Sequence, residues 1–136
     1  MRILVLCDDY WHPARVPRAG LGALPKHEFE FDWIENAREW SAERMTEYQT
    51  VILTKSNHIS SADKTEWMTE AVQTAFANYG RQGRGLLAIH SGSAGYQQTP
   101  GLRALLGGVF LHHPQQCPVT VLPLATHPQR AFHFSR

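Results

Sequence analysis

The chain has 136 residues and a mass of 15.4 kDa, the size of one ordinary domain. Leu, Ile, Val and Phe supply 31 of the 136 residues, which is enough apolar material for a core and excludes a disordered chain. The formal net charge is +1 and no stretch concentrates Lys and Arg, so we expect no nucleic-acid partner. The longest apolar runs are far too short to cross a membrane, and no membrane partner is expected either.

Cysteine and histidine usage adds two observations. Cys7 and Cys117 occur without a secretory leader, which predicts reduced thiols in a cytoplasmic protein and no disulfide framework. The eight histidines are the unusual feature of the composition. They are candidates for acid–base chemistry because imidazole titrates near neutral pH.

The first half of the chain alternates between short apolar runs and longer amphipathic segments. Residues 2–7 form a continuous apolar run, which predicts a strand buried on both faces. A helix is expected to begin at Pro13, and its inner face would carry Ala14, Ala19, Leu21 and Leu24. Further along, residues 28–33 alternate in polarity and predict a half-exposed edge strand, residues 41–48 predict a short helix, and residues 51–53 predict a third strand.

The second half continues this alternation. The spacing of apolar residues predicts a helix over 61–79, with Ser60 and Asp63 forming a relative of the capping box. Residues 86–89 predict a central parallel strand, 99–107 a short helix that ends at two glycines, and 119–122 a last strand. Alternating strands and helices are typical of an α/β domain with a parallel sheet and helices on its faces.

In such sheets ligands bind at the carboxyl ends of strands, so the loops after Cys7, Leu53 and Ile89 are the first places to look for a site. The loop after the first strand carries two carboxylates, two aromatic rings and an imidazole, in the run Asp8-Asp9-Tyr10-Trp11-His12. In the alternative interpretation Asp8 or Asp9 merely caps the following helix and the aromatic rings pack.

The loop after residues 86–89 has the pattern of a nucleophile elbow. Ala88 and Gly92 provide small residues two positions before and two after His90, as a sharp strand-to-helix turn requires. A second elbow pattern, with small residues on both sides of Ser93, would indicate a serine hydrolase. The elbow residue normally follows the strand directly, however, and Ser93 lies three residues after His90. The third alternative is a plain Gly- and Ser-rich turn, which could still bind an anion through its backbone amides.

Cofactor and metal signals are weak. His90, His113 and Asp9 could be imagined as metal ligands, but neither an H-E-x-x-H helix nor a C-x-x-C pair is present, and we expect no metal. Gly20 and Gly22 do not form a dinucleotide fingerprint, because they do not lie in a strand-to-helix turn. No nicotinamide or flavin cofactor is therefore expected.

Three blocks of the sequence, in order along the chain, carry a family resemblance. The first is the apolar run 3–6 with Asp9-Tyr10-Trp11-His12-Pro13, the second is GLLAIHSGSAGY over 85–96, and the third is LLGGVF over 105–110 with His113-Pro114. The run 116–121 and the pair His127-Pro128 extend the match over nearly the whole chain. On these blocks the chain resembles the ThuA-like, trehalose-utilisation family.

The resemblance implies a three-layer α/β/α sandwich, flavodoxin-like and similar to class I glutamine amidotransferases. In that fold the elbow usually holds a cysteine, whereas this chain has His90, so glutamine hydrolysis is not expected. The family is associated with the metabolism of disaccharides such as trehalose, sucrose and maltitol, through keto-sugar intermediates. A small sugar is therefore the expected partner.

Two functional hypotheses follow. In the first, His90 is the general acid or base of a sugar-metabolising enzyme, and the expected substrate-binding residues are Asp9, Tyr10, His12, Ser91, Gly92, Tyr96 and His113. In this hypothesis Asp9 orients His90 or binds a sugar hydroxyl, and the aromatic rings stack on the sugar. In the second, the same residues belong to a non-catalytic sugar-binding or assembly module.

The C-terminal end departs from the family pattern. ThuA-like domains usually continue beyond the His-Pro pair that matches His127 and Pro128, whereas this chain ends at Arg136. We therefore expect a domain truncated at its C-terminus, as a fragment, a frameshifted product or a shortened relative. An exposed sheet edge would favour a homo-oligomer.

Overall fold

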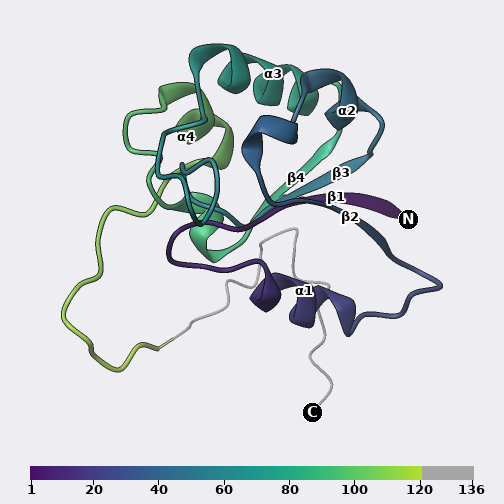
Figure 1. The fold of residues 1–136 in the computed structure, drawn as a ribbon. Coiled ribbons are helices and arrows are strands. Elements are labelled where there is room, and N and C mark those ends of the chain that lie inside the picture. Colours follow the sequence, from purple (N-terminus) through teal and green to yellow (C-terminus); the bar gives the residue numbers. More distant parts are fainter. Residues whose placement is uncertain (121–136) are drawn as a thin grey trace.

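Four parallel strands with helices on both faces make up the computed structural model, which describes residues 1–120 (Figure 1). The elements, in chain order, are β1 (Arg2–Leu6), α1 (Arg15–Gly22), β2 (Glu30–Ile34), the 3-10 helix η1 (Ala37–Glu39), α2 (Ala42–Thr46), β3 (Thr50–Leu53), α3 (Glu70–Arg81), β4 (Gly85–Ala88), the 3-10 helix η2 (His90–Ser93) and α4 (Pro100–Leu106). The α/β fold class predicted from the sequence is confirmed.

The order of the strands places the loop after β1 beside the loop after β3. The sheet reads β2-β1-β3-β4, and each neighbouring pair is parallel. This is the order of a flavodoxin-like fold, in which the chain reverses its direction of winding between β1 and β3. The loops after β1, β3 and β4 consequently emerge at the same carboxyl edge of the sheet, where ligands bind in such folds.

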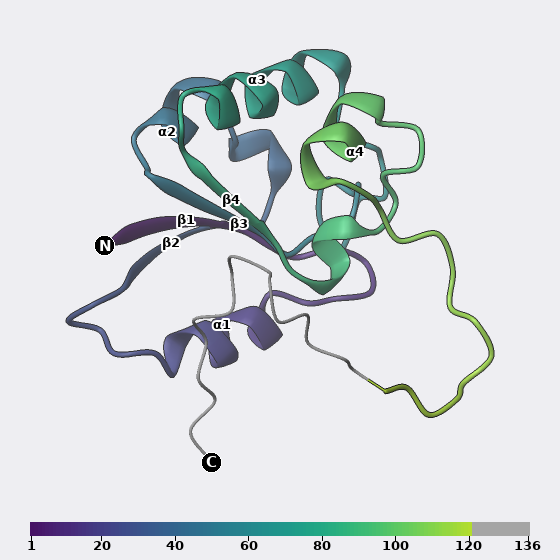
Figure 2. The same ribbon diagram turned by 180° about the vertical axis from the view of Figure 1, so that it is seen from behind.

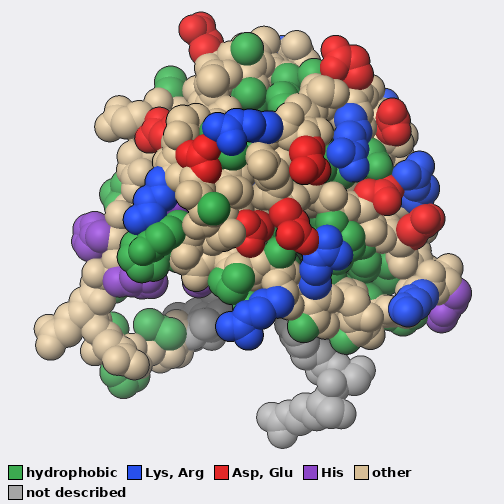
Figure 3. Space-filling model, viewed as in Figure 1, with side chains coloured by type: hydrophobic (Ala, Val, Ile, Leu, Met, Phe, Trp, Pro, Cys, Tyr) green, Lys and Arg blue, Asp and Glu red, His purple; other side chains and the backbone are tan. Residues whose placement is uncertain are grey.

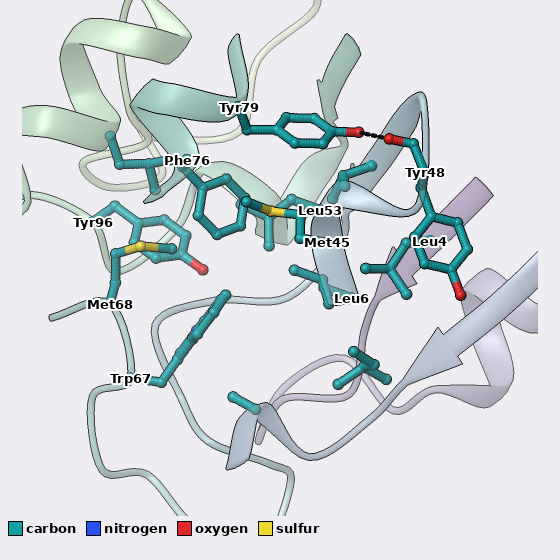
Figure 4. Close-up of a cluster of buried hydrophobic side chains, with 14 of the residues drawn as sticks. Leu4, Leu6, Met45, Tyr48, Leu53, Trp67, Met68, Phe76, Tyr79 and Tyr96 are labelled. Carbon is teal, nitrogen blue, oxygen red and sulfur yellow. Dashed lines mark hydrogen bonds between the residues drawn. The ribbon is translucent and has the colours of Figure 1, made fainter. Parts of the chain in front are cut away.

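Apolar side chains cover both faces of the sheet and form two clusters. The larger one joins β1 and β3 to α2, α3 and α4, and Figure 4 shows its centre, with the Tyr79 hydroxyl donating a hydrogen bond to the backbone carbonyl of Tyr48. The smaller cluster lies on the opposite face, where α1 covers Ile3, Val5 and Ile52. Figure 2 shows the resulting three layers, with α1 on one side and the other helices on the other.

The predicted apolar face of the first helix is only partly confirmed. Ala14 is buried at the start of α1 and Leu21 packs against the smaller cluster. Ala19 and Leu24 are exposed, however. The helix therefore contacts the sheet along a narrower stripe than the sequence predicted.

The longest helix begins later than predicted, at Glu70 and not near Ser61. Its N-cap is Thr69, whose hydroxyl accepts a hydrogen bond from the Val72 amide. The predicted capping pair instead closes a turn, in which the backbone amides and carbonyls of Ser60 and Asp63 bond each other. The chain is not helical up to Thr69, and in this segment the buried Asn57 side chain accepts hydrogen bonds from the amides of Trp67 and Met68.

The positions of the outer strands confirm one prediction and correct another. The strand β2 is at one edge, as the alternation of residues 28–33 predicted. The strand β4 was predicted to be central, yet within residues 1–120 it pairs only with β3, and Leu87 is 51% exposed. Half of the predicted strand 119–122, the pair His127-Pro128 and the C-terminal tail lie outside the described residues, and the two described residues of that strand, Val119 and Thr120, are not in a strand.

Two further observations concern the surface and the length of the helices. Basic and acidic side chains are interspersed on the face shown in Figure 3. Within residues 1–120, no helix has the length and apolar character needed to cross a membrane.

Candidate functional site

The turn after β4 has the strained backbone of an elbow. His90 has a φ of +50°, which a residue with a Cβ rarely adopts, and it begins the 3-10 helix η2 directly after Ile89. One hydrogen bond and one steric requirement accompany this conformation. The Ser91 hydroxyl donates a hydrogen bond of 2.8 Å to the Thr54 carbonyl, and a Cβ at Gly92 would lie 1.9 Å from the Leu53 carbonyl oxygen.

The same geometry explains why small residues surround His90. A Cβ at position 92 would also lie 3.5 Å from the Ala88 Cβ, so residues two before and two after His90 approach each other closely. This is the steric requirement from which the sequence predicted a sharp turn. Ser93 fits the role of the elbow nucleophile less well. Its hydroxyl donates a hydrogen bond to the His90 carbonyl at 3.0 Å, and it is not among the residues that line the histidine-containing cleft described below.

The loop after β1 is organised by Asp9, which is completely buried. One carboxylate oxygen, Oδ1, accepts hydrogen bonds from the amides of Trp11 (2.8 Å) and His12 (2.9 Å). The other, Oδ2, accepts from the Ser56 amide at 2.8 Å and so ties the loop to the segment after β3. Burial alone would raise the pKa of Asp9, but these hydrogen bonds and the one from the His12 ring outweigh it and hold the pKa below its ordinary value.

Asp9 also fixes the ring of His12. Nδ1 of His12 lies 2.9 Å from Oδ1 of Asp9 and 3.1 Å from Oδ2. On the cleft side the His12 ring meets the His90 ring edge to face, with ring centroids 4.8 Å apart. The three side chains therefore form a chain from a buried carboxylate, through one imidazole, to the imidazole at the elbow.

A cleft opens beside the two imidazoles. A cavity of about 100 Å³ is lined by His12, His90, Ser91, Ala94, Phe110 and His113. A wider cavity of about 480 Å³ shares four of these residues and adds Trp11, Ser56, His58, Gly95, Gln97 and Leu111. The cleft thus combines four imidazoles with the Trp11 ring, which is 71% exposed.

Several expected sugar-binding residues do not line this cleft. Tyr96 belongs to the core: its ring is completely buried and its hydroxyl donates to the Lys55 carbonyl at 2.9 Å, so it offers no face to a sugar. Asp9 is enclosed behind His12 and has no exposed surface for a sugar hydroxyl, and its ring partner is His12 and not His90. Tyr10 is half-exposed, with the Lys64 ammonium 3.3 Å from its ring centroid, and it is not among the lining residues of the cleft.

Asp8 has a structural role but is not the helix cap that the alternative interpretation expected: the N-cap of α1 is Ala14, which has no side-chain cap within residues 1–120. The backbone of Asp8 is left-handed, with a φ of +69°. Its carboxylate accepts hydrogen bonds from the Ala14 amide at the start of α1 and from the Ser61 amide. Asp8 therefore fixes the loop after β1 to both α1 and the segment around Ser61, while Asp9 orients the His12 ring.

Several residues of this region were not predicted from the sequence, among them His58 and Lys55. His58 lines the wider cavity, and its Nδ1 lies 3.3 Å from the Ser56 hydroxyl. Lys55 is completely buried and donates to the carbonyls of Glu35 (2.9 Å) and Ile59 (2.8 Å). The polar run that begins at Thr54, directly after a buried strand, is the sequence signal that could have pointed to both.

Two further observations concern metal ligands and the Cys7 thiol. Within residues 1–120, no three His, Cys, Asp or Glu side chains gather closely enough to hold a metal ion. Cys7 is buried, and burial raises the pKa of its thiol to about 12, which disfavours the nucleophilic thiolate.

Comparison with known proteins supports the resemblance that the sequence blocks suggested. Searches among curated proteins and among solved structures found no match. A family model named ThuA, described as trehalose utilisation, matches residues 2–133 and so covers almost the whole chain. The chain belongs to the ThuA family.

Proposed function

We propose that this protein acts on a small carbohydrate and that His90 is a general acid or base of the reaction. The observation that carries the proposal is the strained elbow, which projects His90 into a cleft against His12. Strained backbone persists only where its surroundings enforce it, and such strain is concentrated at functional sites. Imidazole is suited to proton transfer near neutral pH.

The cleft also has features that suit a sugar. Its wider part, of about 480 Å³, is in the range of small-molecule sites. The exposed Trp11 ring offers an apolar face on which a pyranose can stack, and Gln97, Ser56 and the imidazoles supply hydrogen-bonding groups. Family membership directs the choice of sugar to trehalose and related disaccharides.

A second candidate function is sugar binding without turnover. Among residues 1–120, no acidic side chain lines either cavity of the cleft, so these residues do not supply the pair of carboxylates that most glycosidases use. Aromatic and imidazole groups could hold a sugar without breaking a bond. Glutamine hydrolysis is not proposed, because His90 occupies the elbow position where a glutaminase has its cysteine.

Product detection by NMR tests the proposal. Trehalose, sucrose, maltitol and their 3-keto forms would be incubated separately with the wild type, with His90→Ala and with His27→Ala. His27 is a matched control, because its side chain is 81% exposed and it does not line the cleft. We expect turnover by the wild type and by His27→Ala, and a loss of at least about 100-fold in His90→Ala.

The possible outcomes separate the two functions. Equal turnover by His90→Ala and the wild type would contradict the role of His90. Sugar-induced chemical-shift changes without any product would select the binding module over the enzyme. Circular dichroism of each variant checks that the fold is retained.

A further inference from the structure

We infer that His12, oriented by Asp9, is the general base of this cleft and that His90 acts beside it as the acid. This inference rests on the proposed function, which places proton transfer at the elbow, and it assigns the two proton-transfer roles to two different imidazoles. The sequence alone suggested His12 only as a sugar-binding residue. Its surroundings in the folded chain give it a different role.

The first step of the argument concerns Asp9. Its carboxylate is completely buried and accepts three backbone hydrogen bonds, from Trp11, His12 and Ser56, at 2.8–2.9 Å. It has no surface left for a substrate. Within the described part of the chain, the one side chain that hydrogen-bonds to it is His12, whose Nδ1 is 2.9 Å away. Asp9 is therefore a positioning residue, which acts on a ligand only through the His12 ring.

The second step is the protonation of the ring. An ionised carboxylate only accepts hydrogen bonds, so Nδ1 of His12 must carry a proton. In neutral His12 the lone pair is then on Nε2. Since the His12 side chain is 32% exposed and lines both cavities of the cleft, this lone pair is available to a ligand there. A buried carboxylate also stabilises the imidazolium that forms when Nε2 accepts a proton.

The third step is the contrast with His90. The His90 ring has no carboxylate partner among the described residues, and its side chain is exposed at the tip of the elbow. Two imidazoles whose ring centroids are 4.8 Å apart but whose surroundings differ can divide the acid and base roles. The ring held by the carboxylate takes the proton, and the other ring gives one.

The chemistry is limited to substrates that begin to react by losing a proton. Nε2 of His12 takes the proton of a C–H next to a carbonyl, and the electron pair of that bond forms the double bond of an enol while negative charge develops on the carbonyl oxygen. The N–H of the neutral His90 ring gives its proton to this carbonyl oxygen. The two rings regain their starting states when a proton passes back from His12 to His90, directly or through water.

The tautomer of His12 provides a test that does not need a substrate. Long-range proton–nitrogen NMR at pH 8.5 distinguishes a protonated ring nitrogen from one with a lone pair, and a His12→Gln variant assigns the signals. We expect His12 in the wild type to be protonated at Nδ1, with a lone pair on Nε2. The opposite tautomer in the wild type would overturn the inference.

Two carboxylate variants supply the matched comparison. Asp9→Asn can place an amide N–H toward Nδ1, and we expect it to shift His12 toward the Nε2-protonated tautomer. Asp8→Asn removes the neighbouring carboxylate, which bonds only to the amides of Ala14 and Ser61 in the described chain, and we expect it to leave the His12 tautomer unchanged. If Asp9→Asn fails to fold, the wild-type spectrum still decides the tautomer.

Kinetics then separates this inference from the proposed function. On any sugar that the wild type converts, we expect His12→Gln to lower kcat by at least about 100-fold while KM changes little. Turnover by His12→Gln at the wild-type rate would refute the role of His12 and leave the sugar function standing. If no sugar is converted by any form, the proposed function fails, and the tautomer result still reports on the Asp9–His12 pair.

Discussion

Gly92 shows how one residue decides the shape of the elbow. There is no space for a side chain at this position, because a Cβ would lie 1.9 Å from the Leu53 carbonyl oxygen. That oxygen accepts a hydrogen bond of 2.9 Å from the Ile89 amide, which holds it in place. The obstacle is backbone of a paired strand, so it cannot rotate away as a side chain could. We expect Gly92→Ala to lower the free energy of unfolding by about 2 kcal/mol or more, measured by urea denaturation.

Gly20 is the matched control for this substitution. It lies inside α1, and a Cβ at its position would meet no atom within 4 Å. We expect Gly20→Ala to raise the free energy of unfolding by about 0.5–1 kcal/mol, because alanine loses less conformational entropy in a helix. Equal stabilisation by both substitutions would show that the elbow is not packed against Leu53 as described.

Single residues also show which parts of the site the sequence could reveal. The elbow was predictable because its requirement is local: Ala88, His90 and Gly92 lie within five consecutive positions. The burial of Tyr96 was not, because its hydroxyl bonds to the Lys55 carbonyl 41 residues away in the chain. The partner of Asp9 could not be chosen from the sequence either, since His12 and His90 both follow strands that end at the same edge of the sheet.

Among the elements, α3 shows where periodicity misleads. The apolar spacing that predicted a helix from Ser61 counted Met68, which is buried but lies in the extended segment before the helix. Trp67 packs edge to face against Phe76 of α3, with ring centroids 6.1 Å apart, so the segment contributes to the core without being helical. Hydrogen bonds from Trp67 and Met68 to Asn57 replace those of a first helical turn.

The start of α3 can be tested by comparing two hydroxyl residues. Thr69 caps the helix through the Val72 amide, whereas the Ser60 hydroxyl accepts a hydrogen bond from the Ala62 amide in an exposed turn. We expect Thr69→Ala to lower the free energy of unfolding by about 1 kcal/mol, a usual cost for a lost N-cap. Ser60→Ala should change it by less than about 0.5 kcal/mol. The reverse order in urea denaturation would favour a helix that begins near Ser61.

The short strands were the best predicted elements, for a physical reason. Strands buried on both faces read as continuous apolar runs, and β1 and β3 are such runs. Their neighbours in the sheet were harder to predict, because pairing depends on contacts between distant segments. The strand β4 is apolar as a central strand would be, yet within residues 1–120 it has one neighbour, β3.

For the molecule as a whole, the burial of Lys55 links stability to pH. Its ammonium group lies under the Trp67 ring, 5.9 Å from the centroid, and donates to two carbonyls. Burial lowers the pKa of Lys55 to about 8, although the negative charges of Asp8, Asp9 and Glu35 oppose this change. The folded chain therefore loses this proton at a lower pH than the unfolded chain, whose lysine has an ordinary pKa of 10.5.

The direction of the effect follows from proton counting. Between about pH 8 and pH 10.5 the unfolded chain holds more protons at Lys55 than the folded chain, so the free energy of unfolding rises with pH. Cys7 works in the opposite direction from pH 9.0 upward, because burial raises its thiol pKa to about 12 in the folded chain. The unfolded thiol begins to ionise below pH 9 and offsets part of the rise, but between pH 8 and pH 9 the contribution of Lys55 is the larger of the two.

We expect Lys55 to add about 1 kcal/mol to the free energy of unfolding between pH 8 and pH 9, since full linkage of one proton gives about 1.4 kcal/mol per pH unit. Urea denaturation of Lys55→Met across this interval should lack that rise. Lys64→Met removes an exposed lysine and should keep it. The slope is a better measure than the stability itself, because Lys55→Met also leaves the Glu35 and Ile59 carbonyls without their donor. Equal slopes for Lys55→Met and the wild type would mean that the buried lysine keeps its proton throughout, held by the surrounding carboxylates.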